Sequence, residues 1–264
     1  MKNQKLNSLI EKKRVVIVGP SPHLVNKNLG DFIDTFDTVI RINELGVISK
    51  MFPDYGSRTD ISFLTLTDES VPRYMKMKDE IDLDSLKLIV HPRDEFNLNP
   101  YRNVEKTKNV MEYFQYLGLN KKFYHIDNPS FEKRCEIFNC FPSTGSLSII
   151  ELLKYDFEEL YICGFSFYTT KYRYSPKGME YYRIPVKNQH KHNFRQSGHD
   201  TRQEIKVLQK VLKKYPNVIG DKLFTKIVLN SNNFYYETRR FIIYKINLDN
   251  FKNIIKKIFR KKTY

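Results

Sequence analysis

The alternation of strand-like and helix-like segments limits what this chain can fold into more than any other feature. From residue 14 onward, short apolar runs alternate with stretches whose apolar residues recur at helical spacing. Such alternation is typical of a mostly parallel sheet flanked by helices. Strands are predicted over residues 14–18, 37–43, 60–65, 86–91, 122–126, 158–164 and 216–219, and helices over 24–36, 70–81, 104–117, 143–153 and 200–212. The sequence therefore predicts an α/β fold of Rossmann-like type.

Small and polar residues follow the first two predicted strands. Gly19 and Ser21 come after the β-branched run 14–18, and Asn43 ends the next strand. In open α/β sheets, ligands bind beyond the carboxyl ends of the strands. Neither G-x-G-x-x-G nor G-x-x-x-x-G-K-[ST] occurs, so neither the dinucleotide fingerprint nor the P-loop is predicted. We expect Gly19, Ser21 and Asn43 to share one crevice.

A second group of small residues, Ser143, Thr144 and Gly145, opens a predicted helix. Ser143 or Thr144 can cap this helix, whose first backbone N–H groups lack internal partners and attract a phosphate or a carboxylate. Gly164 ends the strand that follows, either because backbone and ligand approach closely there or because the chain simply turns. We expect Ser143 to Gly145 to line the same crevice.

The charge balance favours anionic partners. The 264 residues include 45 basic and 30 acidic side chains, a formal net charge of +15. Such a balance suits an anionic membrane face or phosphorylated and acidic sugars; the alternative is lysine spread over a solvated surface. We expect no nucleic-acid partner, since the sequence carries no RNP, KH or zinc signature.

The chain divides into three parts. Residues 1–13 form an N-terminal extension, 14–230 one domain with a lid over about 167–198, and 231–264 a basic amphipathic segment. We expect this segment to be a helix that contacts an anionic membrane, or, as the alternative, one docked on the protein's own surface. No signal peptide or membrane span is evident, and the three cysteines form no C-x-x-C, so we expect a cytoplasmic protein. If the basic segment contacts a membrane, the protein would be peripheral on the inner membrane face.

Three motifs in order resemble those of glycosyltransferase family 29, the sialyltransferases. The large motif is similar to residues 15–59, which end in Gly-Ser-Arg-Thr. The small motif is similar to residues 142–165, and the very small motif to residues 198–204, with His199 and Glu204 at the family's spacing. The resemblance implies a GT-A-like variant of the fold, so that residues 14–230 would form its catalytic domain.

The resemblance also implies an activity. The family transfers sialic acid, or a related acidic sugar such as Kdo, from a CMP conjugate to a glycan hydroxyl with inversion, and needs neither a metal nor a cofactor. His199 is expected to be the catalytic base. Glu204 is expected to support the local structure, and Arg58 with Ser57 to pin a loop. The expected donor-binding residues are Gly19, Ser21, Asn43, Ser143, Thr144, Gly145, Gly164, Tyr181 and Tyr182.

The chain departs from the family at three places. Pro20 stands where the family has an asparagine that helps to bind the donor phosphate. A further motif of the family, which precedes the very small one, is best matched by residues 180–183 and lacks the family's histidine. His190 or His192 could take the place of that histidine. Val15 and Tyr155 match the cysteines of the family's Golgi disulfide. The loss of both fits a reducing compartment.

These departures keep two alternatives open. One is a transferase that uses another nucleotide sugar, in which the Asp82-Leu83-Asp84 pattern would hold a metal rather than form the solvated turn that we expect. The other is a catalytically inactive protein that binds glycans or membranes through the same fold.

Overall fold

The predicted strands form one parallel sheet. The structure is a computed structural model that describes residues 3–64, 80–91, 112, 115, 118–119, 122–170 and 200–230. Within these residues, seven strands pair in the order β5-β4-β3-β2-β1-β6-β7, and every pairing is parallel. Their bounds are β1 (Arg14–Val18), β2 (Thr38–Ile42), β3 (Ile61–Phe63), β4 (Leu88–His91), β5 (Phe123–His125), β6 (Glu159–Cys163) and β7 (Val218–Gly220).

The order of the strands reverses once, beside β1. The chain steps outward from β1 to β5, then returns to lay β6 along the free side of β1, with Val16 opposite Tyr161. β7 follows at the outer side of β6. A parallel sheet has its crevice at such a reversal, outside the carboxyl ends of the strands. The point between β1 and β6 is therefore the place to look for a ligand site.

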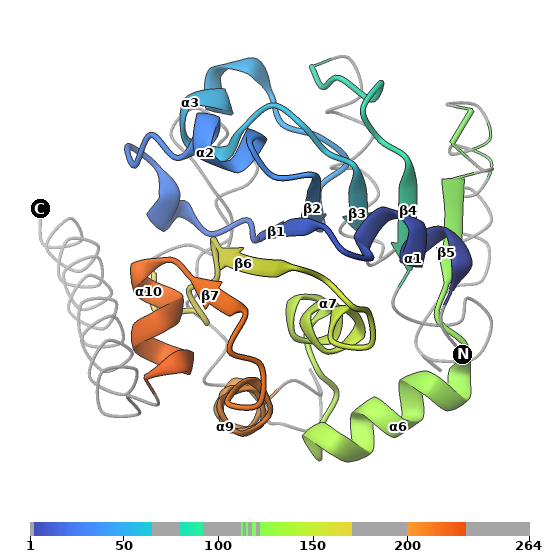
Figure 1. Ribbon diagram of the computed structural model, residues 1–264, viewed down its shortest axis with the longest axis vertical. Helices are drawn as coiled ribbons and strands as arrows, with labels where there is room; N and C mark the ends of the chain where they lie inside the picture. The colour runs from blue at the N-terminus through green and yellow to red at the C-terminus, as the bar shows by residue number, and fades with distance from the viewer. Residues whose placement is uncertain are drawn as a thin grey trace, which may run out of the picture.

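Helices cover both faces of the sheet. In β1, Val15 and Ile17 belong to one core cluster and Val16 and Val18 to another, as the alternation of side chains along a strand requires. The first cluster includes residues of α1 (Gln4–Ile10), α7 (Thr144–Leu152) and α9 (Thr201–Leu212). The second includes residues of α2 (Gly30–Asp34) and α3 (Phe52–Tyr55). Figure 1 shows α2 and α3 on one side of the sheet and α7 and α9 on the other. This arrangement confirms the α/β, Rossmann-like prediction.

Several helices were not predicted from the sequence, among them the short α3. Helix α1 falls in residues 1–13, and its Leu6 and Ile10 are fully buried in the core. Helix α6 (Asn128–Phe138) begins after Asp127, whose side chain accepts the backbone N–H of Ser130. Beyond α9, the described chain ends in α10 (Lys222–Phe224) and one π-helical turn over Thr225–Leu229.

The helix predicted over residues 24–36 is wrong for its first half. Only a 3₁₀ turn, η1 (Pro22–Leu24), and the short α2 form there. Between them, the carboxylate of Asp54 accepts the backbone N–H groups of residues 26, 27 and 28, and Asn26 and Asn28 have positive φ. A distant side chain thus takes the hydrogen bonds that a helix would use.

Several predicted segments lie outside the described residues. These are most of the helices predicted over 70–81 and 104–117, the lid from residue 171 to residue 198, and the C-terminal segment 231–264. Among the helices that the structure describes, none combines the length and the hydropathy needed to cross a bilayer.

Candidate active site

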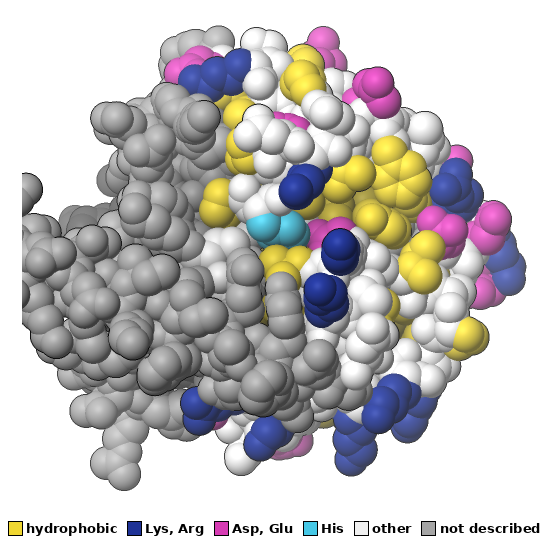
Figure 2. All heavy atoms as spheres, turned by 90° about the vertical axis from the view of Figure 1, so that its left-hand side faces the viewer, with side chains coloured by type: hydrophobic (Ala, Val, Ile, Leu, Met, Phe, Trp, Pro, Cys, Tyr) yellow, Lys and Arg dark blue, Asp and Glu magenta, His cyan; other side chains and the backbone are white. Residues whose placement is uncertain are grey.

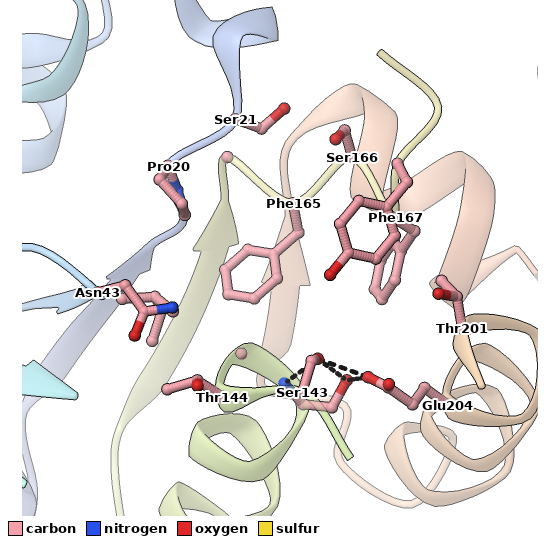
Figure 3. Close-up of a pocket in the computed structure, with 15 residues that line it drawn as sticks. Pro20, Ser21, Asn43, Ser143, Thr144, Phe165, Ser166, Phe167, Thr201 and Glu204 are labelled. Carbon is pink, nitrogen blue, oxygen red and sulfur yellow. Dashed lines mark hydrogen bonds between the residues drawn. The ribbon is translucent and has the colours of Figure 1, made fainter. Parts of the chain in front are cut away.

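A pocket opens where the carboxyl ends of β1, β2 and β6 meet the N-terminal turn of α7. Pro20 and Ser21 lie along one side of it, and Ser143 and Thr144 along the opposite side (Figure 3). The first turn of α9 closes it with Glu204. The lining residues are Pro20, Ser21, Ile42, Asn43, Ser143, Thr144, Gly145, Ser146, Gly164, Phe165, Ser166, Phe167, Tyr168, Thr201 and Glu204. The pocket therefore lies at the reversal in strand order.

Two glycines shape the floor between β1 and β6. A Cβ on Gly19 would lie 2.4 Å from the carbonyl oxygen of Gly164, and a Cβ on Gly164 would lie 2.2 Å from that of Gly19. Gly164 also has φ +76°, in the left-handed region that favours glycine. The close approach is thus between two backbones. Gly164 lines the pocket, whereas Gly19, which was also predicted to bind the donor, packs against Gly164 and is not among the lining residues.

Of the two residues that the sequence offered as a cap for α7, Ser143 is the one that caps it. Its hydroxyl oxygen accepts the backbone N–H of Ser146 at 3.4 Å. The N–H groups in the first turn of a helix have no carbonyl partner within it, and the helix dipole places partial positive charge there. The side of the pocket formed by Ser143 to Gly145 is therefore suited to an anionic group.

Glu204 ties α9 to this cap. Its Oε2 accepts the hydroxyl of Ser143 at 2.5 Å and also the hydroxyl of Ser146 (Figure 3). The side chain is 2% exposed, and burial raises its pKa to about 7 although the two hydroxyls favour the charged form. These contacts give Glu204 the supporting position that the sequence analysis expects. They also hold the Ser143 hydroxyl against α9.

Asn43 and the aromatic residues after β6 form the rest of the wall. Asn43 has φ +57°, which asparagine tolerates better than most residues, and its backbone N–H donates to the carbonyl of Phe63. Phe167 and Tyr168 both have positive φ as well. Two such residues in a row store backbone strain, which proteins concentrate at functional sites.

The pocket gathers most of the predicted donor-binding residues. Ser21, Asn43, Ser143, Thr144, Gly145 and Gly164 all line it. His199, Tyr181 and Tyr182, with His190 and His192, lie outside the described residues. Asp200, which follows His199 in the chain, caps α9 by accepting the backbone N–H of Gln203.

Four parts of the wall are absent from the donor-binding residues predicted from the sequence. They are Ile42, Ser146, the run 165–168 and Thr201. The last two residues of that run begin the predicted lid, and the loop after each strand at the reversal faces the crevice, which is the signal for the whole run. Thr201 lies within residues 198–204, so the resemblance to the very small motif is the signal for it.

Two further expectations concern residues away from the pocket lining. Arg58 donates to the carbonyls of Asp34 and Phe36 and to Asp60, so it pins the loop as expected. Asp82 accepts the backbone N–H of Asp84 at 2.8 Å, and both aspartates are exposed. Within the described ranges, no three His, Cys, Asp or Glu side chains gather closely enough to hold a metal ion.

Comparison with known proteins places these residues in context. The model of glycosyltransferase family 29 (sialyltransferase) matches residues 2–215. No curated protein sequence matches the chain. Among solved structures, a mammalian sialyltransferase in complex with Gal-β1-3GalNAc-ortho-nitrophenol is 18% identical, with a TM-score of 0.47 over 83% of this chain and 73% of that one. The sialyltransferase CstII from Campylobacter jejuni, in complex with the substrate analogue CMP-3FNeuAc, is also 18% identical, with a TM-score of 0.46 over 82% and 85%.

Proposed function

Because the chain belongs to glycosyltransferase family 29 (sialyltransferase), we propose that it transfers sialic acid, or a related acidic sugar such as Kdo, from a CMP conjugate to a glycan hydroxyl. The reaction inverts the configuration of the sugar and needs no cofactor besides its donor. One observation carries the proposal. Residues from all three motifs, among them Ser21, Ser143 and Glu204, meet in one pocket at the strand reversal.

The pocket suits a donor of this class because the two bear matching groups. A CMP conjugate of an acidic sugar carries two anionic groups, the phosphate and the sugar carboxylate. Ser21 and the first turn of α7 line the pocket on opposite sides (Figure 3), and they can supply a hydroxyl and backbone N–H groups as hydrogen-bond donors. Pro20 and Ile42 add apolar surface between them. We assign the phosphate to the Ser21 side and the carboxylate to α7.

The chemistry requires a base and a stabilised leaving group. His199 takes the proton from the acceptor hydroxyl, whose oxygen attacks the anomeric carbon opposite the phosphate. The bond from that carbon to the phosphate oxygen breaks, and CMP leaves with the electron pair. A single phosphate leaves with little charge to compensate, so hydroxyl and N–H donors suffice in place of a metal.

The test is release of CMP from CMP-sialic acid and from CMP-Kdo, with and without mixed glycan acceptors. We expect acceptor-stimulated release that EDTA leaves unchanged. His199→Ala should keep CMP binding nearly intact and lower turnover by about 10²-fold or more. Unchanged turnover in this variant would remove His199 from the mechanism. Dependence on added divalent metal would overturn the metal-free reaction.

One observation favours a second candidate, a transferase for another nucleotide sugar. Pro20 lines the pocket at the position where the family has a phosphate-binding asparagine, and proline has neither an amide side chain nor a backbone N–H. Preference for UDP over CMP in a binding assay would support this candidate.

A further inference from the structure

A chain of hydrogen bonds runs from the pocket to the far side of β6. The hydroxyl of Ser21 lies 2.9 Å from Nδ1 of His23, and Nε2 of the same ring lies 2.8 Å from Oδ2 of Asp221. Ser21 is 3% exposed and lines the pocket, whereas the side chain of His23 is 17% exposed. Figure 2 shows the end of the molecule to which β1 and β6 point, with a histidine side chain at the surface between basic and acidic ones.

Asp221 is held in its charged form. Its Oδ1 accepts the backbone N–H groups of Leu223 and Phe224, and its Oδ2 accepts that of Gly164 as well as the bond from His23. Burial alone would raise the pKa of Asp221, but its hydrogen bonds from His23 and from backbone N–H groups hold it below the ordinary value. An ionised carboxylate only accepts, so Nε2 of His23 must carry a proton.

Whether Nδ1 of His23 carries a proton then determines whether the Ser21 hydroxyl can donate a hydrogen bond to a ligand in the pocket. In the neutral ring, Nδ1 accepts, so the single hydrogen of the Ser21 hydroxyl points at His23 and a lone pair faces the ligand. In the imidazolium, Nδ1–H donates to the Ser21 oxygen, and the hydroxyl hydrogen turns toward the pocket. Only the second state can donate a hydrogen bond to an anion.

The backbone of Ser21 is fixed, so this choice is confined to the hydroxyl. Its N–H donates to the carbonyl of Gly164 at 3.1 Å, and its carbonyl accepts the hydroxyl of Tyr55 at 2.7 Å. Two other titratable groups, Cys163 and Tyr161, lie near Asp221. Burial raises the pKa of the Cys163 thiol well above 9 and that of Tyr161 to about 12, so both are neutral near pH 7. Among the charged groups, the structure places Asp221 in direct contact with His23.

We propose that His23 is a positioning residue that couples binding of the donor phosphate at Ser21 to the uptake of one proton. The proton leaves the buffer acid and binds Nδ1, and the Ser21 hydroxyl then donates to a phosphate oxygen. The inference rests on the proposed function and extends it, because it makes the affinity for CMP depend on a group outside the pocket lining.

The test is calorimetric titration of the full chain with CMP at pH 7.5 in two buffers of different ionisation enthalpy. The difference between the two heats gives the number of protons bound with each CMP. We expect the protein to take up a measurable fraction of a proton, with about one proton as the ceiling. CMP affinity should fall as pH rises, because a complex that takes up a proton on binding is favoured at higher proton concentration.

Two variants separate this role from a structural one. His23→Asn keeps an N–H donor near the Nδ1 position but does not titrate; it should bind CMP within a few-fold of the parent and lose the proton uptake. Ser21→Ala keeps His23 and Asp221; it should also lose the uptake and bind CMP about tenfold or more weakly. Ser8→Ala, at an exposed serine remote from the pocket, is the matched control and should retain both. Protonation of the CMP phosphate itself is common to all these proteins and cancels in the comparison.

The outcomes are distinct. Proton uptake that persists in Ser21→Ala, or that is equal in His23→Asn and the parent, overturns the proposed coupling through His23. Either result leaves the proposed function standing. Absence of CMP binding to the parent overturns the proposed donor, and this inference with it.

Discussion

At the scale of single residues, one glycine shows why the floor of the pocket accepts no side chain. Gly164 combines φ +76° with a backbone oxygen 2.2 Å from where its Cβ would lie. Gly118 has a similar φ, +68°, but nothing lies within 4 Å of its Cβ position. The two positions therefore separate the cost of the conformation from the cost of the contact.

We predict that Gly118→Ala lowers the free energy of unfolding by about 1–2 kcal/mol, the cost of a left-handed alanine. Gly164→Ala should cost several kcal/mol more, because β1 and β6 must move apart. Urea denaturation of both variants measures the difference. Equal costs would mean that β1 and β6 can separate freely at the pocket floor.

Glu204 makes stability depend on pH. Its pKa is about 7 in the folded protein, against an ordinary value of 4.5. Between these values the folded protein keeps a proton that the unfolded chain has lost, so the free energy of unfolding falls as pH rises. The contribution is complete below pH 4.5 and lost by pH 7.

We predict that this loss amounts to about 3 kcal/mol between pH 4.5 and 7. Glu204→Gln, which cannot titrate, should flatten the curve over that window. Denaturant titrations at several pH values give the comparison. The lowered pKa of Asp221 and that of Lys154, lowered to about 8, act outside the window and do not interfere. A variant as pH-dependent as the parent would contradict the assignment to Glu204.

At the scale of elements, a buried ion pair joins α6 to α7. Arg134 and Glu151 contact each other with side chains 3% and 2% exposed, and Lys154 also approaches Glu151 at 2.9 Å. The desolvation cost of a buried ion pair nearly equals the energy of its electrostatic attraction. Removal of one partner, however, leaves the other charge buried and unpaired.

We therefore predict that Glu151→Leu lowers the free energy of unfolding by about 3–5 kcal/mol. Addition of Arg134→Met should restore most of this loss, since the second substitution removes the stranded cation. The double-mutant cycle in urea measures the coupling. Strictly additive losses would show that the two helices dock independently of the pair.

At the scale of the whole molecule, the pocket joins β1, β2 and β6 to the first turns of α7 and α9. A ligand that binds there contacts segments more than a hundred residues apart and stabilises the fold only in its assembled state. Ligand-linked stability therefore reports on the donor class.

We predict that CMP at about a hundred times its dissociation constant adds roughly 2.7 kcal/mol, which raises the melting temperature by roughly 5–10 °C in a domain of this size. UMP and UDP should raise it less. Thermal unfolding with each nucleotide, with and without Mn²⁺, gives the comparison. A larger shift with UDP and Mn²⁺ would favour the second candidate and direct attention to Asp82 and Asp84.

The sequence by itself determined the seven strands, the capped start of α7, and six residues of the pocket wall. These follow from local signals: β-branched runs, hydroxyl caps, and small residues after strands. Predictions from local signals were wrong where a side chain distant in the sequence takes the backbone hydrogen bonds. Asp54 takes the backbone N–H groups of residues 26–28, so the helix predicted there does not form.

Only the tertiary structure decided which strand lies beside β1 and which side chains meet across the pocket. The contact between Ser143 and Glu204 spans 61 positions and that between His23 and Asp221 spans 198. Such pairs depend on the order of strands in the sheet, which periodicity along the chain does not specify. Parallel pairing brings the carboxyl ends of β1, β2 and β6 to one edge, and that placement assembles the site.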